Sequence, residues 1–285
     1  MNPIADPCAD LTGGFLLMDV SANSDINYES FRTVSCVPSG LTKAAELMPC
    51  LISVSDLSSS QLEQLVDIFR QQATGEHAFA ICAWIECDLK IGDLAEHLAL
   101  FLCGLGPDGA KVLWRFFDPR AFATSMSVLS QEQRQSLLGP IKSWRFTWCR
   151  NWWLISHKPC KPCPLSDSHT GWPTAQQWPL VQGTRVIHRT VNQLDNEMKL
   201  RAEQCVQILN AAITSFEDAI RLNLHNENDQ AEFVYLCVKY GPAYRRHPKL
   251  ARAWDELTQG NVGWIDVRSQ LLAADFDHLK VVIYS

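Results

Sequence analysis

The period of the hydrophobic pattern changes once along this 285-residue chain, near residue 190. Beyond that point apolar residues recur every three or four positions, which is the spacing of one buried helix face. The run comprises Leu194, Met198, Ala202, Cys205, Leu209, Ala212, Phe216 and Ala219. It predicts one long amphipathic helix followed by shorter ones, so residues 191–285 are expected to form an all-α helical lobe. The apolar segment 279–284 is a candidate final strand, which would return to the sheet of the first lobe.

Residues 1–156 instead alternate short apolar runs with amphipathic segments. The run 79–85 is apolar almost throughout, as in a central strand that is covered on both faces. The segments with the length and apolar content of strands are residues 15–20, 79–85, 111–117, 144–148 and 152–155. Together these patterns predict an α/β lobe, in which a mixed sheet is flanked by helices.

Residues 157–190 separate the two predicted lobes and differ from both in composition. They are rich in Pro, Ser, His, Gln and Gly and show little periodicity. Such a composition is typical of an irregular loop or linker.

The charge balance argues against two classes of partner. The net charge is -6, and each side of residue 190 carries -3, from 15 basic and 18 acidic residues before it and 10 and 13 after it. Neither part is basic enough for nucleic acid or an anionic membrane to be the main partner. No stretch approaches the ~18 continuous apolar residues of a membrane helix, and no basic residue precedes Arg32 to lead a signal peptide. We therefore expect a cytoplasmic protein, with most of its eleven cysteines buried as small hydrophobes.

One cluster in the linker has metal-ligand character. His157, Cys160, Cys163 and His169 fall within thirteen positions and could close a tetrahedral zinc site. A redox role for the Cys160–Cys163 pair is disfavoured, because no amphipathic helix follows that would lower the pKa of the first thiol. Two ordinary cysteines in a polar loop are the favoured interpretation. No catalytic sequence motif is visible elsewhere, so we expect neither an enzyme nor a cofactor; a zinc- or thiol-dependent enzyme that uses this loop is kept as an alternative.

Two groups of aromatic and basic residues are candidates for contact with a partner. Trp172 and Trp178 lie in the polar linker, where large aromatics can anchor a protein interface, although core packing explains most of the other tryptophans. The second group is the link between two predicted helices, where an acidic or C-terminal peptide could dock; a solvated loop that caps helix ends is favoured there. Its candidate residues are Tyr240, Tyr244, Arg245 and Arg246.

A longer pattern in the first lobe resembles the family known as domain of unknown function 4123. Residues 13–146 carry the resemblance, with Cys50 standing where an aromatic is common. Asp118 and Pro119 have the sequence of a helix N-terminus, so we expect them to be structural. The motif residues are Trp114, Arg115, Phe116, Phe117, Asp118, Pro119, Arg120, Gly139, Pro140 and Trp144.

The resemblance implies a role in type VI secretion. Members of the family are associated with adaptors or chaperones, which bind a toxic effector in the donor cytoplasm and promote its loading onto the spike protein VgrG. Such a protein would act by protein–protein contact, without catalysis. The helical lobe is assigned to the effector, since that half is variable in the family. An immunity-type protein that neutralises a toxin is the main alternative.

Overall fold

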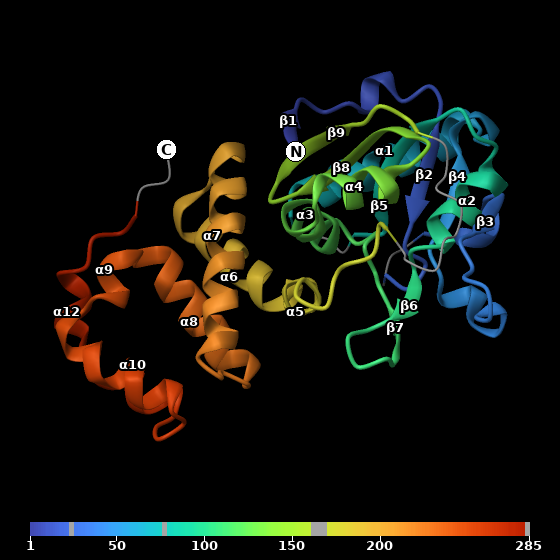
Figure 1. Ribbon diagram of the computed structural model, residues 1–285. Helices are drawn as coiled ribbons and strands as arrows, with labels where there is room; N and C mark the ends of the chain where they lie inside the picture. Colours follow the sequence, from blue (N-terminus) through green and yellow to red (C-terminus); the bar gives the residue numbers. More distant parts are fainter. Residues whose placement is uncertain (23–25, 76–78, 161–169, 283–285) are drawn as a thin grey trace. The chain divides into compact units, whose positions relative to one another are not determined.

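The computed structural model describes residues 1–22, 26–75, 79–160 and 170–282, and its chain divides into two compact units (Figure 1). The N-terminal unit spans Met1–Val181 and contains every described strand, and the C-terminal unit spans Gln182–Ser285. The expected order of an α/β part and a helical part is therefore confirmed.

A seven-stranded sheet forms the centre of the N-terminal unit, in the order β1-β9-β8-β5-β2-β4-β3. Each neighbouring pair is antiparallel, so the sheet has none of the parallel pairs that a mixed sheet would contain. As predicted for residues 79–85, β5 is a buried central strand between β2 and β8. The strands are β1 (Asn2–Ile4), β2 (Phe15–Met18), β3 (Thr33–Ser35), β4 (Cys50–Ser53), β5 (Ile81–Cys87), β8 (Ile141–Trp148) and β9 (Asn151–Ser156).

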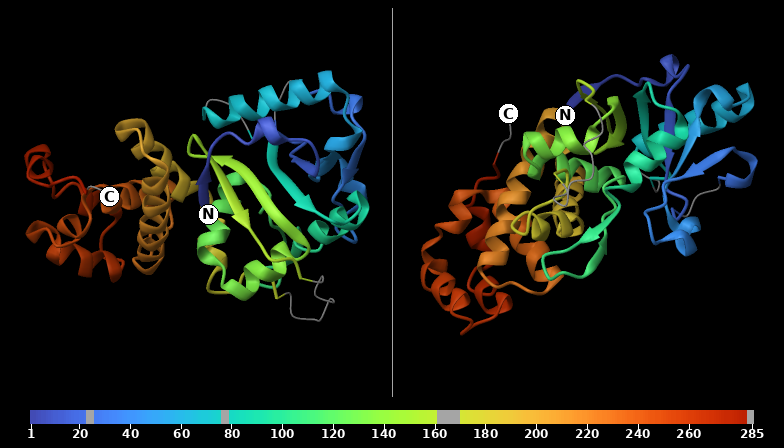
Figure 2. Two further views of the ribbon diagram at one scale, coloured as in Figure 1. Left: turned by 90° about the horizontal axis from the view of Figure 1, so that it is seen from above. Right: turned by 45° about the vertical axis from the view of Figure 1, so that its right-hand side comes forward.

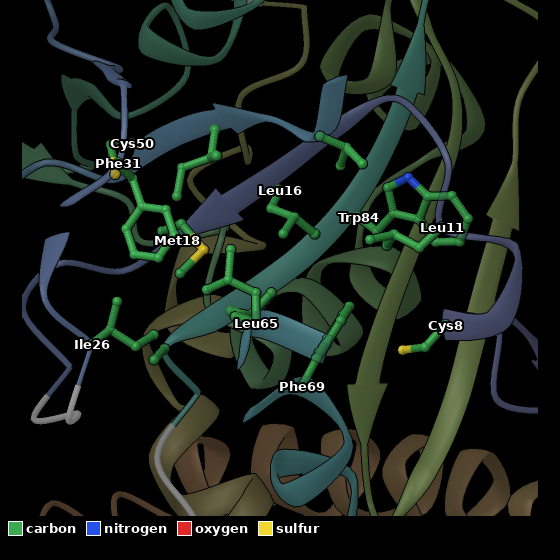
Figure 3. Packing of buried hydrophobic residues seen from close by; sticks show 14 of the residues in the cluster. Cys8, Leu11, Leu16, Met18, Ile26, Phe31, Cys50, Leu65, Phe69 and Trp84 are labelled. Atoms are coloured by element: carbon green, nitrogen blue, oxygen red, sulfur yellow. The ribbon is translucent and has the colours of Figure 1, made fainter. Parts of the chain in front are cut away.

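One face of this sheet is covered by helix α1 (Ser59–Ala73). Leu65 and Phe69 of α1 lie in one buried cluster with Leu16 and Trp84 of the sheet, as Figure 3 shows. Ser58 caps the N-terminus of the helix, because its side chain accepts a hydrogen bond from the backbone N–H of Gln61. This amphipathic helix therefore buries its apolar face directly on β2 and β5.

The opposite face is covered by helices α2 (Ile91–Ala99), α3 (Pro119–Val128) and α4 (Gln131–Leu138), as Figure 2 shows. Trp144 of β8 points to this side, because its neighbour Arg145 pairs with Trp84 on the α1 side and side chains alternate along a strand. Its ring stacks on Phe122 of α3 at 4.4 Å. The sheet is thus buried between two helical layers, which explains its apolar central strands.

A separate two-stranded sheet consists of β6 (Cys103–Leu105) and β7 (Lys111–Leu113). The predicted strand 111–117 is shorter than expected and ends at Leu113. Beyond Leu113 the backbone N–H of Asp118 donates to the carbonyl oxygen of Arg115 at 3.0 Å, which is a turn, and Trp114, Phe116 and Phe117 are all buried. The chain therefore leaves the strand after Leu113 and turns into the core.

The expectation that Trp172 and Trp178 are exposed anchors is wrong. Both are buried within the N-terminal unit, at 8% and 3% exposure. Their rings lie 5.3 Å apart and pack on the ring of Trp114 at 5.4 and 6.2 Å. The indole Nε1 of Trp172 also donates to the carbonyl oxygen of Leu105 at 3.1 Å. The polar composition of the linker concealed a cluster of three indoles that shields these rings from water.

The helical unit contains two helices where the sequence predicted one. Helix α6 ends at Met198 and α7 begins at Ala202, because Lys199 adopts a left-handed conformation with φ 54°. Helices α6, α7 and α8 pack against one another, so the apolar period continues across the break. Helix α5 (Trp178–Gln182) lies at the end of the N-terminal unit, and the helices of the helical unit are α6 (Thr184–Met198), α7 (Ala202–Arg221), α8 (Glu227–Tyr240), α9 (Pro242–Arg245), α10 (Ala251–Thr258), α11 (Trp264–Arg268) and α12 (Ala273–Asp277).

The candidate strand 279–284 is not a strand as far as the structure describes it, through Val282. The backbone N–H of Val282 instead donates to the carbonyl oxygen of Lys239 at 2.8 Å, within the helical unit. Short 3-10 helices complete both units: η1 (Cys8–Asp10), η2 (Tyr28–Ser30), η3 (Thr42–Leu47), η4 (Val54–Asp56) and η5 (Pro248–Leu250).

The contact between the hairpin and Trp172 yields a first prediction. A Cβ atom on Gly104 would lie 2.5 Å from the Trp172 ring, so Gly104→Ala should lower the free energy of unfolding by about 1–3 kcal/mol. Gly92→Ala is the matched control, because nothing lies within 4 Å of its added Cβ and alanine favours helix α2. Urea denaturation measures both. Equal stability of Gly104→Ala and the wild type would contradict this packing.

A second prediction concerns His97 of α2, whose Nε2 donates to the carbonyl oxygen of Leu137 at 3.0 Å. Burial disfavours the imidazolium and lowers the pKa of His97 below its usual 6.5. Below that pH the unfolded chain binds a proton that the folded chain does not, so the free energy of unfolding should fall as the pH decreases from about 6.5, by up to about 1.4 kcal/mol per unit. Urea titrations of His97→Gln, which keeps a donor but does not titrate, should show a flatter pH dependence. The same slope in both proteins would refute this role.

Candidate interaction site

The aromatic residues of the sequence motif belong to the core. Trp114, Phe116, Phe117 and Trp144 are each at most 3% exposed. Phe116 bridges the others, with ring centroids 5.3 Å from Trp114 and 6.5 Å from Trp144. These side chains hold the segment in place and are not available to a partner.

Asp118 and Pro119 have the structural role predicted for them. The Asp118 carboxylate accepts a hydrogen bond of 2.8 Å from the backbone N–H of Arg120, and Pro119 is the first residue of α3. Gly139 ends α4 with φ 47°, and a Cβ there would come within 2.5 Å of the His97 ring. Pro140 follows it and is buried.

The two arginines of the motif, in contrast, reach the surface. The Arg115 guanidinium forms an ion pair with Asp19, which directly follows β2, and its Nη1 donates to the Ser21 hydroxyl at 3.2 Å. The same guanidinium lies 5.1 Å from the centre of the Phe117 ring. The Arg115 side chain remains 41% exposed, whereas that of Asp19 is 8% exposed. The buried carboxylate therefore holds a cation whose outer face meets water.

Arg120 is held in a similar way by its own helix cap. Its Nε and Nη2 donate to the two carboxylate oxygens of Asp118 at 3.0 and 2.6 Å, a bidentate pair. The guanidinium also lies 5.6 Å from the centre of the Phe79 ring. Its side chain is 49% exposed.

The two ion pairs form one group, which we call the paired-arginine cluster: Asp19, Ser21, Arg115, Asp118 and Arg120. The pKa of Arg120 is raised, first by its hydrogen bond to Asp118 and, more weakly, by the charge of Asp19. Nε of Arg115 and Nη1 of Arg120 donate to no described residue. The cluster can therefore offer N–H groups of both guanidiniums to a carboxylate or a carbonyl of a partner.

The predicted zinc residues are only partly within the described chain. Cys163 and His169 lie outside it. The His157 Nε2 donates to the carbonyl oxygen of Gly139 at 3.2 Å, and the backbone N–H of Cys160 donates to the same oxygen at 2.9 Å. Among the described residues, no three His, Cys, Asp or Glu side chains gather as metal ligands would. What the structure does show is that His157 and Cys160 cap the C-terminus of α4.

The basic aromatic link of the helical unit is largely structural. Tyr244 is fully buried, and Arg245 forms an ion pair of 2.7 Å with Asp218 while its guanidinium lies over Phe233 at 5.4 Å. Tyr240 is half-buried against Phe276, with ring centroids 5.7 Å apart. Arg246 is exposed. A docking role for Tyr244 is therefore wrong, because no partner can reach its side chain.

Sequence reasoning missed Asp19 and Ser21. Arg115 and Asp19 are 96 residues apart in the chain, and their contact depends on how the turn after β7 packs beside β2. A usable signal existed, since Asp19 directly interrupts the apolar run of a predicted strand. A carboxylate at the end of a buried strand requires a partner.

Fold and site together define a two-unit protein with an antiparallel α/β part that presents paired arginines. A comparison with known families finds a match within this part. Residues 38–136 match the family described as "Domain of unknown function (DUF4123)". The match confirms the resemblance over these residues, which contain the motif from Trp114 to Arg120, whereas Gly139, Pro140 and Trp144 lie beyond it. No curated protein matches the chain, and no solved structure does. Within the described residues, no helix is both long and apolar enough to cross a membrane.

A third prediction tests the Asp19–Arg115 pair. Arg115→Ala leaves the buried Asp19 carboxylate without its cation and should lower the free energy of unfolding by about 1–2 kcal/mol, a value reduced for solvent screening of the half-exposed guanidinium. Arg32→Ala is the control, since the Arg32 side chain is 86% exposed and lies 3.9 Å from Asp56; it should change stability by less than about 0.5 kcal/mol. The double variant Asp19→Asn with Arg115→Ala completes a cycle in urea. Strictly additive losses would argue against the pair.

Proposed function

We propose that the protein is an adaptor, or chaperone, of type VI secretion. It binds an effector in the cytoplasm of the donor bacterium and promotes its loading onto the VgrG spike. The proposal extends the role associated with the matched family to this chain, and its action requires contact only.

One observation carries the proposal: the family motif is divided between the core and the surface. Its aromatic rings are buried, while Arg115 and Arg120 keep about half of their side chains in water. A motif needed only for folding would not have to keep two charged groups at the surface. Arginine is enriched where proteins bind one another, because its planar guanidinium combines charge, several donors and an apolar face.

The cluster is also suited to binding at low entropic cost. Each guanidinium is already oriented by a carboxylate and an aromatic ring, so less rotamer freedom is lost when a partner arrives. The carboxylates lie behind the arginines and offset part of their charge, which favours an oriented contact over general attraction to anions. A stable complex would bury about 1,200–2,000 Å² in total, so the cluster is one part of a larger interface.

The two units are assigned to two partners in this proposal. The helical unit contacts the effector, since that half is variable in the family. The α/β unit, with the paired-arginine cluster, faces the spike protein. An immunity-type protein remains the competing function, and so, more remotely, does a zinc- or thiol-dependent enzyme using the Cys160–Cys163 loop.

The proposal predicts a secretion defect. Deletion of the gene in the native bacterium should abolish export of an effector encoded near a VgrG gene, measured by immunoblot of the culture supernatant, and the wild-type gene should restore it. Arg120→Gln removes the exposed cation but keeps the backbone N–H that Asp118 caps, so it should restore export only partly. Arg32→Gln, an exposed arginine of the same unit, should restore it fully.

Three outcomes would contradict the adaptor function. Export that is unchanged by the deletion would remove it. Protection of cells from the toxin by this protein alone would favour an immunity role. Conversion of a small molecule by the purified protein without a partner would favour an enzyme.

A further inference from the structure

The hairpin of β6 and β7 has one face that is largely exposed. Its register pairs Leu105 with Lys111 and Cys103 with Leu113, so these four side chains share a face. Leu105 is 60% and Leu113 is 44% exposed. The other face carries Gly104, which lies against the Trp172 ring. The hairpin is therefore packed on Trp172 through its Gly104 face and exposed on its Leu105 and Leu113 face. It extends away from the large sheet (Figure 1).

The two edges of the hairpin differ as well. On β6, the carbonyl oxygen of Leu105 accepts the Trp172 indole N–H, so this edge is partly occupied. The cross-strand bonds that flank the hairpin join Trp114 to Leu102 and Gly106 to Ala110. Because hydrogen-bonded and non-hydrogen-bonded pairs alternate in an antiparallel ladder, the N–H and C=O groups of Lys111 and Leu113 point away from β6. They form no hydrogen bond with a described residue.

An open edge of this kind can template another strand. A two-stranded sheet is marginal in isolation, and a third strand supplies the missing hydrogen bonds and side chains that flank Leu113. Leu113 would then pack against a side chain of the added strand, whereas Leu105 lies on β6, on the other side of β7.

The charges along this edge indicate the chemistry of that strand. Lys111 is exposed and forms no ion pair with a described residue. Arg115 lies two residues after Leu113, beyond the end of the strand, and its half-exposed guanidinium is paired with Asp19. The carboxylate nearest the turn, Asp108, accepts the backbone N–H of Ala110 at 3.0 Å. A strand beside β7 would therefore meet Leu113 next to Lys111, with Arg115 just beyond the end of the strand.

We propose that β7 binds an extended segment of a partner protein, with alternating apolar residues and carboxylates at its two ends, as a third strand of the hairpin. The inference rests on the proposed function, in which the α/β unit faces the spike protein. Main-chain hydrogen bonds along Lys111–Leu113 supply affinity, and Lys111 and Arg115 select acidic segments.

A random peptide library displayed on phage, panned on the immobilised full-length chain, tests the proposal. Enriched peptides should alternate apolar residues and carry carboxylates. Leu113→Pro removes an outward N–H and places a ring in the path of the added strand, but it leaves the bonds between β6 and β7 intact, so peptide affinity should fall about tenfold or more. Leu47→Ala, which removes another exposed leucine of this unit, should leave the affinity unchanged.

If Leu113→Pro fails to fold, the charge reversal Lys111→Glu tests the same binding edge. Lys111→Glu should weaken binding of the acidic peptides, whereas Lys43→Glu, the same change at another exposed lysine of the unit, should not. Binding unaffected by both hairpin variants, or enrichment of sequences without acidic residues, would overturn the proposal. Self-association of the wild type that is lost in Leu113→Pro would assign the edge to a second copy of this chain.

The same variants separate this inference from the adaptor function. If Leu113→Pro and Lys111→Glu restore effector export in the deletion strain, strand addition at β7 is wrong and the adaptor role stands. If the deletion itself leaves export unchanged, the adaptor role is wrong, whatever the peptides show.

Discussion

Burial of Trp114, Phe116 and Phe117 within four successive positions is the constraint on which the N-terminal unit depends. Strand β7 ends at Leu113, and the chain then turns, with the backbone N–H of Asp118 donating to the carbonyl oxygen of Arg115 at 3.0 Å. Each ring removes about 150–250 Å² from water, an upper bound of about 4–6 kcal/mol. That turn directs Arg115 outward to Asp19, starts α3 at Asp118 and leaves the hairpin as a separate sheet.

The paired-arginine cluster illustrates how a motif can serve folding and binding together. The carboxylate of Asp118 closes the N-terminus of α3 through the Arg120 backbone and orients the Arg120 guanidinium through its side chain. Asp19 likewise ends a central strand and fixes Arg115. The chain is acidic overall, yet this surface presents cations, because each acid is turned inward behind its arginine.

The fold could be predicted where a pattern reports burial directly. The uninterrupted apolar run identified β5 as a central strand, and the change of period identified the helical unit. The break at Lys199 could not be predicted, because the apolar period shows which face is buried and is insensitive to a short turn that keeps both helices on the same core. Of the candidate site, the arginines were found, whereas Asp19 depends on a tertiary contact that local sequence does not encode.

The three indoles of Trp114, Trp172 and Trp178 have an optical consequence. Their ring centroids lie 5.3–6.2 Å apart and their planes are inclined by 67–85°. The intense far-ultraviolet transition dipoles of indoles this close and this oblique couple, so the cluster should produce an exciton contribution to the far-ultraviolet ellipticity. Because the Trp172 indole donates a hydrogen bond to the Leu105 carbonyl oxygen of β6, a displacement of the hairpin should change this signal. The ellipticity therefore reports the position of the hairpin without an added label.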